Sequence, residues 1–181
     1  MFRKLRIKFI ATATLAITLI LTFFLILMNS IVYTQTEDNI HTVLSILTKN
    51  EGELPITDEV KESLTEKNIQ EGIVYNFQYF SVREKENDYA ISLTNVQSLT
   101  EDEVKSFLPN VLKKQETYGT ITHKGRYFTY QVSQSTTGKL LVFFETTYYI
   151  RERDTLLQVS IWLALASLLL LILLFTLISG I

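Results

Sequence analysis

The chain lacks several residue types that particular chemistries require. None of its 181 residues is cysteine, so no disulfide can stabilise it and no thiolate can act as a nucleophile or metal ligand. The two histidines, His41 and His123, lie far apart in the sequence and have no neighbours at metal-ligand spacing, which disfavours a metal site. The sequence also has no glycine-rich phosphate loop and suggests no Ser-His-Asp arrangement, so no catalytic residue is predicted.

Charged residues are absent from two long stretches, Phe9 to Val32 and Leu156 to Ile178. An α-helix rises about 1.5 Å per residue, so the first stretch would be about 36 Å long and would cross a hydrocarbon core of about 30 Å with some tilt. The sequence therefore predicts two transmembrane helices, over residues 9–33 and 156–179, with the lipid bilayer as a partner. The first stretch is longer than the core of a cleaved signal peptide, so we expect a retained anchor.

The basic residues before the first stretch predict the orientation. Residues 1–8 contain Arg3, Lys4, Arg6 and Lys8 and no acid, which favours a cytoplasmic N-terminus. Residues 34–155 would then lie outside the membrane, and the C-terminus would return to the cytoplasm. No basic residue follows the second stretch, so residues 180–181 are interpreted as a truncated cytoplasmic exit of a longer protein.

The segment between the two stretches is acidic and long enough for one small core. It carries 13 basic and 19 acidic residues, a net charge of −6, which argues against nucleic acid as a partner. Two acidic groups, 58–62 and 101–103, could gather divalent cations. We favour the alternative that Asp58, Glu59 and Glu62, like Glu101, Asp102 and Glu103, complement the positive ends of helices.

A long helix is predicted to leave the membrane and enter this segment. Neither glycine nor proline occurs between Phe9 and Asn50. The apolar residues that follow the first span at helical spacing are Ile40, Val43, Leu44 and Leu47. This signal-relay helix either packs on its own sheet or forms a dimer seam that transmits motion, and both interpretations stay open.

The remaining pattern predicts an α+β domain. Short helices begin at Thr57 and at Thr100, where Glu103 completes a capping box, and Pro109 should kink or split the second helix. Strands are predicted over 76–82, 89–93, 118–122, 127–133 and 140–146, with turns at 84–88, Lys124-Gly125 and Thr137-Gly138. The predicted core includes Ile91, Phe107, Phe128 and Phe143. A five-stranded antiparallel sheet with helices covering one face fits this order, an arrangement similar to extracytoplasmic PAS-like sensor domains.

Within the spans, small residues recur at helical spacing. They are Thr14, Thr18 and Thr22 in the first span and Ser160 and Ala164 in the second. Such stripes let helices approach closely, although each hydroxyl can instead bond its own i−4 carbonyl. Tyr33, Tyr148, Tyr149 and Trp162 are interpreted as anchors at the membrane interface. The other aromatic residues either line a ligand pocket or form the core.

Four stretches carry a resemblance to a known family. They are Met1 to Ile10, Tyr79-Phe80-Ser81-Val82, Arg126-Tyr127-Phe128 after a glycine turn, and Arg151 to Leu157 before the second span. Through these stretches the chain resembles the N-terminal input half of a membrane-bound, Gram-positive-type sensor histidine kinase of a two-component system. The resemblance covers essentially the full length of the chain. The resemblance implies a homodimeric, multi-pass protein of a bacterial cell membrane that relays an external signal.

The parts that such a kinase needs for phosphorelay have no counterpart in this sequence. The resemblance implies that ATP and a cytoplasmic response regulator would engage only a missing C-terminal kinase, and no cofactor is expected in this chain. Two alternatives stay open: the input module of a chemoreceptor or cyclase, or a stand-alone two-pass envelope protein that binds or assembles partners. The sequence does not predict the sensed ligand.

Overall fold

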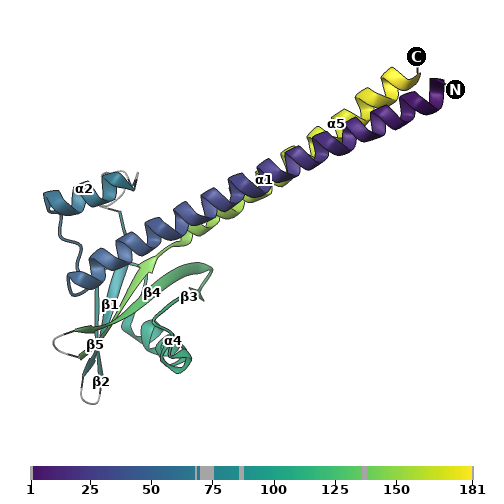
Figure 1. Cartoon of the computed structure of the whole chain (residues 1–181). Coiled ribbons are helices and arrows are strands. Elements are labelled where there is room, and N and C mark those ends of the chain that lie inside the picture. The colour runs from purple at the N-terminus through teal and green to yellow at the C-terminus, as the bar shows by residue number, and fades with distance from the viewer. Residues whose placement is uncertain (1, 68, 70–75, 86–87, 136–137, 181) are drawn as a thin grey trace. The chain divides into compact units, whose positions relative to one another are not determined.

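The computed structural model describes residues 2–67, 69, 76–85, 88–135 and 138–180 (Figure 1). Two of the predicted turns include residues outside this set, 86–87 in one and Thr137 in the other. Ile181 and the side chains of Arg3 and Lys4 also lie outside it. Contacts divide the chain into two units: unit 1 is Met1–Gln35 with Arg151–Ile181, and unit 2 is Thr36–Ile150.

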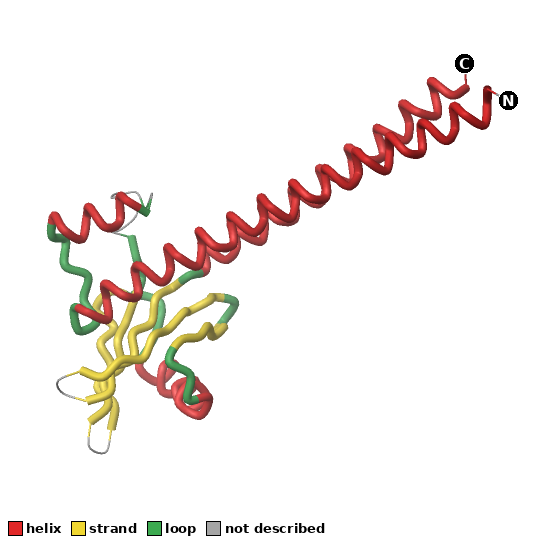
Figure 2. The backbone as a smooth tube through the Cα atoms, in the orientation of Figure 1, coloured by secondary structure: helices red, strands yellow, loops and turns green. Residues whose placement is uncertain are grey.

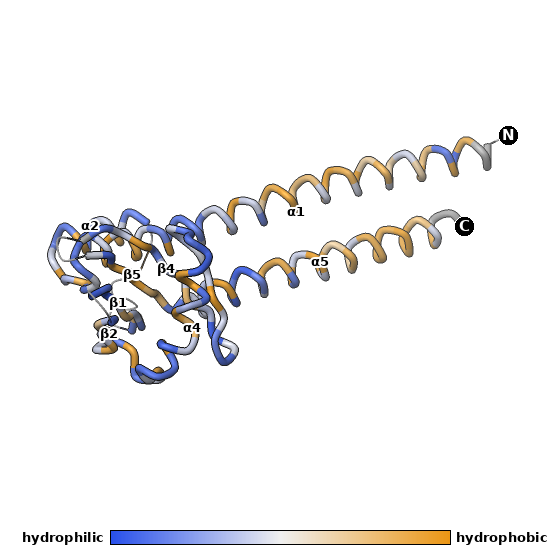
Figure 3. The backbone as a smooth tube through the Cα atoms, turned by 90° about the horizontal axis from the view of Figure 1, so that it is seen from below, coloured by the Kyte–Doolittle hydropathy of each residue, from blue (hydrophilic) through white to orange (hydrophobic). Residues whose placement is uncertain are grey.

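Unit 1 consists of two long apolar helical segments. They belong to α1 (Phe2–Lys49) and α5 (Thr147–Gly180), and they run alongside each other (Figures 1 and 3). By length and composition, the helical stretches Leu5–Lys49 and Thr147–Leu177 can each cross a membrane. Both predicted spans are therefore helical, and α5 begins at Thr147, before the first residue of the second predicted span.

Helix α1 is unbroken because neither glycine nor proline occurs within it. It ends where Glu51 takes a left-handed conformation, with φ 57°, and Gly52 follows with φ 91°. The Gly52 N–H donates to the Leu47 carbonyl at 2.8 Å, which is the long-range bond of a Schellman cap. The prediction of one helix that continues to about Asn50 is confirmed.

Both short helices begin at the predicted caps. In α2 (Asp58–Glu66) the Val60 N–H donates to Thr57 Oγ1 at 3.4 Å. In α4 (Glu101–Lys114) the capping box is complete, because the Glu103 N–H donates to Thr100 Oγ1 at 3.3 Å and the Thr100 N–H donates to the Glu103 carboxylate at 2.9 Å.

Helix α4 continues through Pro109, so of the two predicted outcomes, a kink or a split, the split is excluded. The proline removes one backbone hydrogen bond. Buried apolar side chains on both sides of it pack on the same surface of the sheet, and this shared packing keeps the helix in one piece. They are Val104, Phe107, Leu108 and Val111.

Five antiparallel strands form one sheet in the order β2-β1-β5-β4-β3, as predicted for an α+β domain (Figure 2). They are β1 (Tyr79–Lys85), β2 (Asp88–Asn95), β3 (Tyr118–His123), β4 (Arg126–Ser135) and β5 (Gly138–Glu145). The last strand, β5, lies between β1 and β4 and joins the two hairpins. The first strand begins at Tyr79 and not at Asn76, because its partner β5 ends at Glu145 and the chain then enters α5.

The turn between β3 and β4 is the predicted Lys124-Gly125 pair. Both residues have positive φ, 49° and 74°, which is the type I′ geometry that matches the twist of a two-residue hairpin. His123 and Arg126 are the last paired residues on either side.

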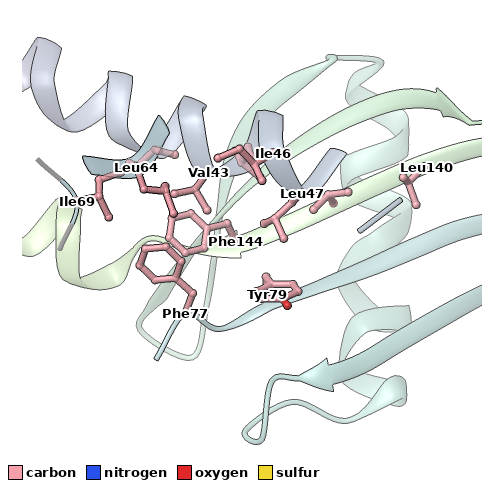
Figure 4. Close-up of a cluster of buried hydrophobic side chains, with 12 residues drawn as sticks. Val43, Ile46, Leu47, Leu64, Ile69, Phe77, Tyr79, Leu140 and Phe144 are labelled. Atoms are coloured by element: carbon pink, nitrogen blue, oxygen red, sulfur yellow. The ribbon is translucent and has the colours of Figure 1, made fainter. Parts of the chain in front are cut away.

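Helices cover both faces of the sheet, which corrects the prediction that they cover one. The end of α1 and α2 pack on the face that carries Leu140, Val142 and Phe144 of β5 (Figure 4). Helix α4 packs on the opposite face, over Leu141 and Phe143. Of this strand the prediction placed only Phe143 in the core, whereas all five consecutive residues are buried, as expected for a central strand covered on both sides.

Three of the four predicted core residues are confirmed. Phe128 and Phe143 are fully buried and Phe107 is 9% exposed, all in the cluster under α4. Ile91 is only half-buried, because it lies on the edge strand β2 and touches the rim of that cluster. The centre of the cluster is a stacked pair, Phe80 on Phe143, with ring centroids 4.6 Å apart.

Candidate functional site

The predicted signal-relay residues lie inside unit 2. Ile40, Val43, Leu44 and Leu47 are at most 1% exposed and belong to the cluster between α1, α2 and the sheet, where Figure 4 labels Val43 and Leu47. They pack on their own sheet, so a seam with a second chain would have to use other side chains of α1. The transmission of motion through this helix stays a prediction.

The small residues predicted to pack the spans have their hydroxyls satisfied within their own helices. Thr14, Thr18 and Thr22 donate to the carbonyls four residues earlier at 2.8–2.9 Å, and Ser160 does the same at 2.7 Å. All of these except Thr22 are half-buried, as is Ala164. Any close helix packing at these positions therefore depends on small side-chain size and not on hydrogen bonds between helices.

The predicted interfacial aromatics differ in exposure. Tyr33, Tyr148 and Trp162 are 54–71% exposed, and the Arg153 guanidinium lies 5.1 Å from the centre of the Tyr33 ring. Tyr149 is half-buried, with its ring 5.9 Å from that of Phe144, so it also contributes to the core of unit 2.

The two histidines occupy separate places. The His41 ring on α1 lies 5.9 Å from Tyr118, and the His123 ring at the end of β3 lies 5.3 Å from Phe107. Asp58 and Glu59 occupy the first turn of α2, and Glu62 follows in the second turn. The second acidic group, 101–103, occupies the first turn of α4, as the helix-dipole interpretation predicts. Among the residues that the structure describes, no group of three or more histidine, aspartate or glutamate side chains is placed to hold a metal ion.

A groove of about 610 Å³ lies beside the hairpin of β1 and β2 in unit 2. We call it the β1–β2 groove. The floor consists of side chains on the sheet face opposite the α4 cluster, because Val82, Tyr89 and Ile91 point to that cluster and their neighbours point away from it. The floor residues are Ser81, Ala90, Ser92 and Thr94.

The loop after α1, Glu51 to Pro55, forms one wall of the groove. Gly52 packs directly on Ser81: a Cβ atom at Gly52 would lie 2.7 Å from the Ser81 Cβ. Only glycine allows this approach at φ 91°. Because Gly52 has no side chain, the loop can pack closely against the floor of the groove.

Charges of both signs line the groove. Arg83 Nη2 lies 2.8 Å from Glu51 Oε2, and these two side chains are 30% and 48% exposed. Lys85 and Glu53, both exposed, also line it. Because the Arg83–Glu51 pair remains open to solvent, its direct contribution to stability is small, and both groups are accessible to a ligand.

A tyrosine side chain, Tyr79, also lines the groove. Tyr79 accepts a hydrogen bond from the Leu54 N–H at 3.3 Å. Burial raises the pKa of Tyr79, and the Glu53 carboxylate also raises it, whereas hydrogen bonds with Leu54 and Asn95 oppose the increase. The hydroxyl is therefore neutral at physiological pH and can donate as well as accept. The donors, acceptors and charges of the groove suit binding, and they do not form a nucleophile with an adjacent base.

A second groove in unit 2, of about 470 Å³, is mainly aromatic. Phe77, Phe144, Tyr148 and Tyr149 line it, so part of the aromatic content does border a hollow, although most of the buried rings form the core.

Sequence reasoning missed the β1–β2 groove. Its residues come from segments about 30 and 10 positions apart. The strand register brings β1 and β2 together, with Ser81 paired with Ser92 and Arg83 with Ala90, and the path of the loop after α1 brings Glu51 to Arg83. The sequence feature that could have predicted the groove is the polar residue at every second position of β1, Ser81, Arg83 and Lys85. Such a pattern indicates a strand face that no helix covers.

Comparison with protein-family models, with curated proteins and with solved structures found no match to this chain. The resemblance to sensor histidine kinases therefore rests on the sequence pattern alone.

Proposed function

We propose that this chain is the membrane-spanning input module of a signalling receptor, with a PAS-like sensor domain outside the cell membrane. In this proposal unit 1 crosses the bilayer and unit 2 responds to an external signal. The relay then passes to a cytoplasmic transmitter, of which a sensor histidine kinase is the type that the sequence resembles.

The observation that carries the proposal is the continuity of α1. One helix without a break contains the uncharged apolar stretch and also the buried residues Val43, Leu44 and Leu47, which belong to the core of unit 2. A rearrangement of that core therefore acts on a rigid element that continues into a span. At the other end, β5 passes into α5 after Thr146 alone, so the central strand also connects directly to a span.

A signal produces relay only if it binds two arrangements of the domain with different affinity. Packed helices with two arrangements typically differ by shifts of about 1–2 Å. The two direct connections, α1 into the core and β5 into α5, would convert such a shift into displacement of one span against the other.

The orientation can be tested with single cysteines, since the natural chain has none. On intact cells, an impermeant maleimide should label Lys67→Cys and Lys124→Cys, because both lie in the segment proposed to be outside. Lys8→Cys, among the basic residues before the first span, should be labelled only after the cells are opened. Labelling of Lys8→Cys alone on intact cells would reverse the orientation and remove the sensor proposal.

The relay further requires two copies of the chain with their first spans in register. Single cysteines placed in turn from Ile17 to Leu27 should crosslink in membranes with maxima every three or four residues, the repeat of a helix face. Uniform crosslinking along this segment would instead favour a monomeric two-pass protein.

A further inference from the structure

The β1–β2 groove, defined above, has the walls of a site for a ligand with two opposite charges. Arg83 and Lys85 supply two cations, and Glu51 and Glu53 supply two carboxylates. A ligand with a single charge would be attracted by one of these pairs and repelled by the other. A ligand with a carboxylate and an ammonium group can satisfy both pairs, and arginine binds a carboxylate through two parallel hydrogen bonds.

The floor of the groove allows such a ligand to approach the sheet closely. Ala90 and Ser92 are small, and the hydroxyls of Ser92 and Thr94 lie 3.3 Å apart. The volume, about 610 Å³, lies in the range of about 300–1,000 Å³ that small-molecule sites occupy, so the groove can hold a side chain as well as the two charged groups.

We infer that the β1–β2 groove binds a free α-amino acid, with its carboxylate at Arg83 and Lys85 and its ammonium group at Glu51 and Glu53. This inference deepens the proposed sensor function and rests on it for its biological meaning. The binding itself depends only on the residues of the groove.

The position of Glu51 connects this site to the signal-relay helix. Glu51 comes two residues after Lys49, the last residue of α1, and the following Gly52 N–H donates to the Leu47 carbonyl at 2.8 Å. A ligand carboxylate that engages Arg83 competes with Glu51 for the same guanidinium. Occupancy of the groove therefore changes the forces on the cap of α1, next to the buried Leu47.

The test uses the full chain in lipid nanodiscs. Each common L-α-amino acid is added at millimolar concentration, and unfolding of unit 2 is followed by the near-ultraviolet circular dichroism of its tyrosines. At least one amino acid should raise the melting temperature by about 5 °C, the shift expected when ligand exceeds its Kd by about tenfold. The N-acetyl and the amide forms of that amino acid, each with one charge removed, should lose most of the shift.

Two pairs of variants locate the site. Ser92→Leu fills the floor and should abolish the shift, whereas Thr122→Leu, an exposed position on the opposite edge strand, should retain it. Arg83→Gln should weaken binding at least tenfold, whereas Lys113→Gln, exposed on α4, should not. Circular dichroism without ligand shows whether each variant is folded. If Ser92→Leu does not fold, the comparison of Arg83→Gln with Lys113→Gln tests whether the groove binds the amino acid.

Three results would overturn the inference: no stabilisation by any amino acid, an equal shift from the N-acetyl form, or a full shift in folded Ser92→Leu and Arg83→Gln. These outcomes are separate from a failure of the proposed function. Binding in the groove together with a reversed membrane orientation removes the sensor proposal alone, and correct orientation without amino-acid binding removes the inference alone.

Discussion

The two faces of the sheet in unit 2 differ in chemistry although they belong to the same five strands. The face under α4 is apolar across the sheet, from Ile91 on the edge strand β2 to Ile121 on the opposite edge strand β3. The face under α1 is apolar over β5, with Leu140, Val142 and Phe144, and becomes polar over the β1–β2 hairpin.

This difference follows from what covers each face. Helix α4 brings a stripe of buried apolar residues over its face. On the other face, α1 ends at Lys49, and the loop that follows covers the hairpin only along one side. Polar and charged side chains therefore occupy the uncovered part. One face provides stability, and the other combines stability with a surface that a ligand can reach.

The largest expected effect is the loss of an aromatic ring from the α4 face. Phe143→Ala should lower the free energy of unfolding by about 3–5 kcal/mol, because it removes a fully buried ring stacked on Phe80 and leaves a closed cavity. Near-ultraviolet circular dichroism of the full chain in nanodiscs measures this in unit 2, since the only tryptophan, Trp162, lies in α5.

The matched variant on the other face is Phe144→Ala. Phe144 is 1% exposed, but its ring lines the aromatic groove of about 470 Å³, so the space left by truncation opens to an existing hollow. We expect a loss nearer the lower end of the same range, about 3 kcal/mol. A loss equal to or greater than that of Phe143→Ala would show that the two faces support the fold equally.

Local signals made much of this architecture predictable. Thr57 and the Thr100–Glu103 capping box mark where two helices begin, and Gly125 marks a two-residue turn. The absence of glycine and proline from α1 predicted its length. These features depend on residues close together in sequence, where backbone sterics and hydrogen bonding decide the structure.

Features that depend on distant residues were not predicted. Of the run from Leu140 to Phe144 only Phe143 was assigned to the core, although five consecutive apolar residues are buried there, which indicates a central strand. The charged wall of the β1–β2 groove requires Glu51 to meet Arg83, and only the path of the loop after α1 brings them together. Pro109 was predicted to kink or split α4, and the helix is not split, because packing on the sheet outweighs the local preference.

The smallest expected effect concerns an ionic contact at the rim of the α4 face. The Lys124 ammonium donates to the Glu103 carboxylate, and the Thr100 N–H adds a second hydrogen bond; together they lower the pKa of Glu103 from its usual 4.5 to about 2. His123 Nε2 lies 3.9 Å from the same carboxylate. Because the pKa is lowered on folding, the carboxylate stabilises the fold above pH 4.5, and this contribution disappears as the pH falls through about 2.

Glu103→Gln isolates the charge, because glutamine can still complete the capping box. The variant should melt at a lower temperature than the natural chain at neutral pH, and the difference should shrink as the pH falls from about 4.5 to about 2. Glu101→Gln, in the same helical turn and exposed, is the control and should show a smaller, less pH-dependent difference. If the two variants follow the same pH profile, the contact between α4 and the β3–β4 turn does not stabilise the rim, and the stability of the α4 face comes from its apolar cluster alone.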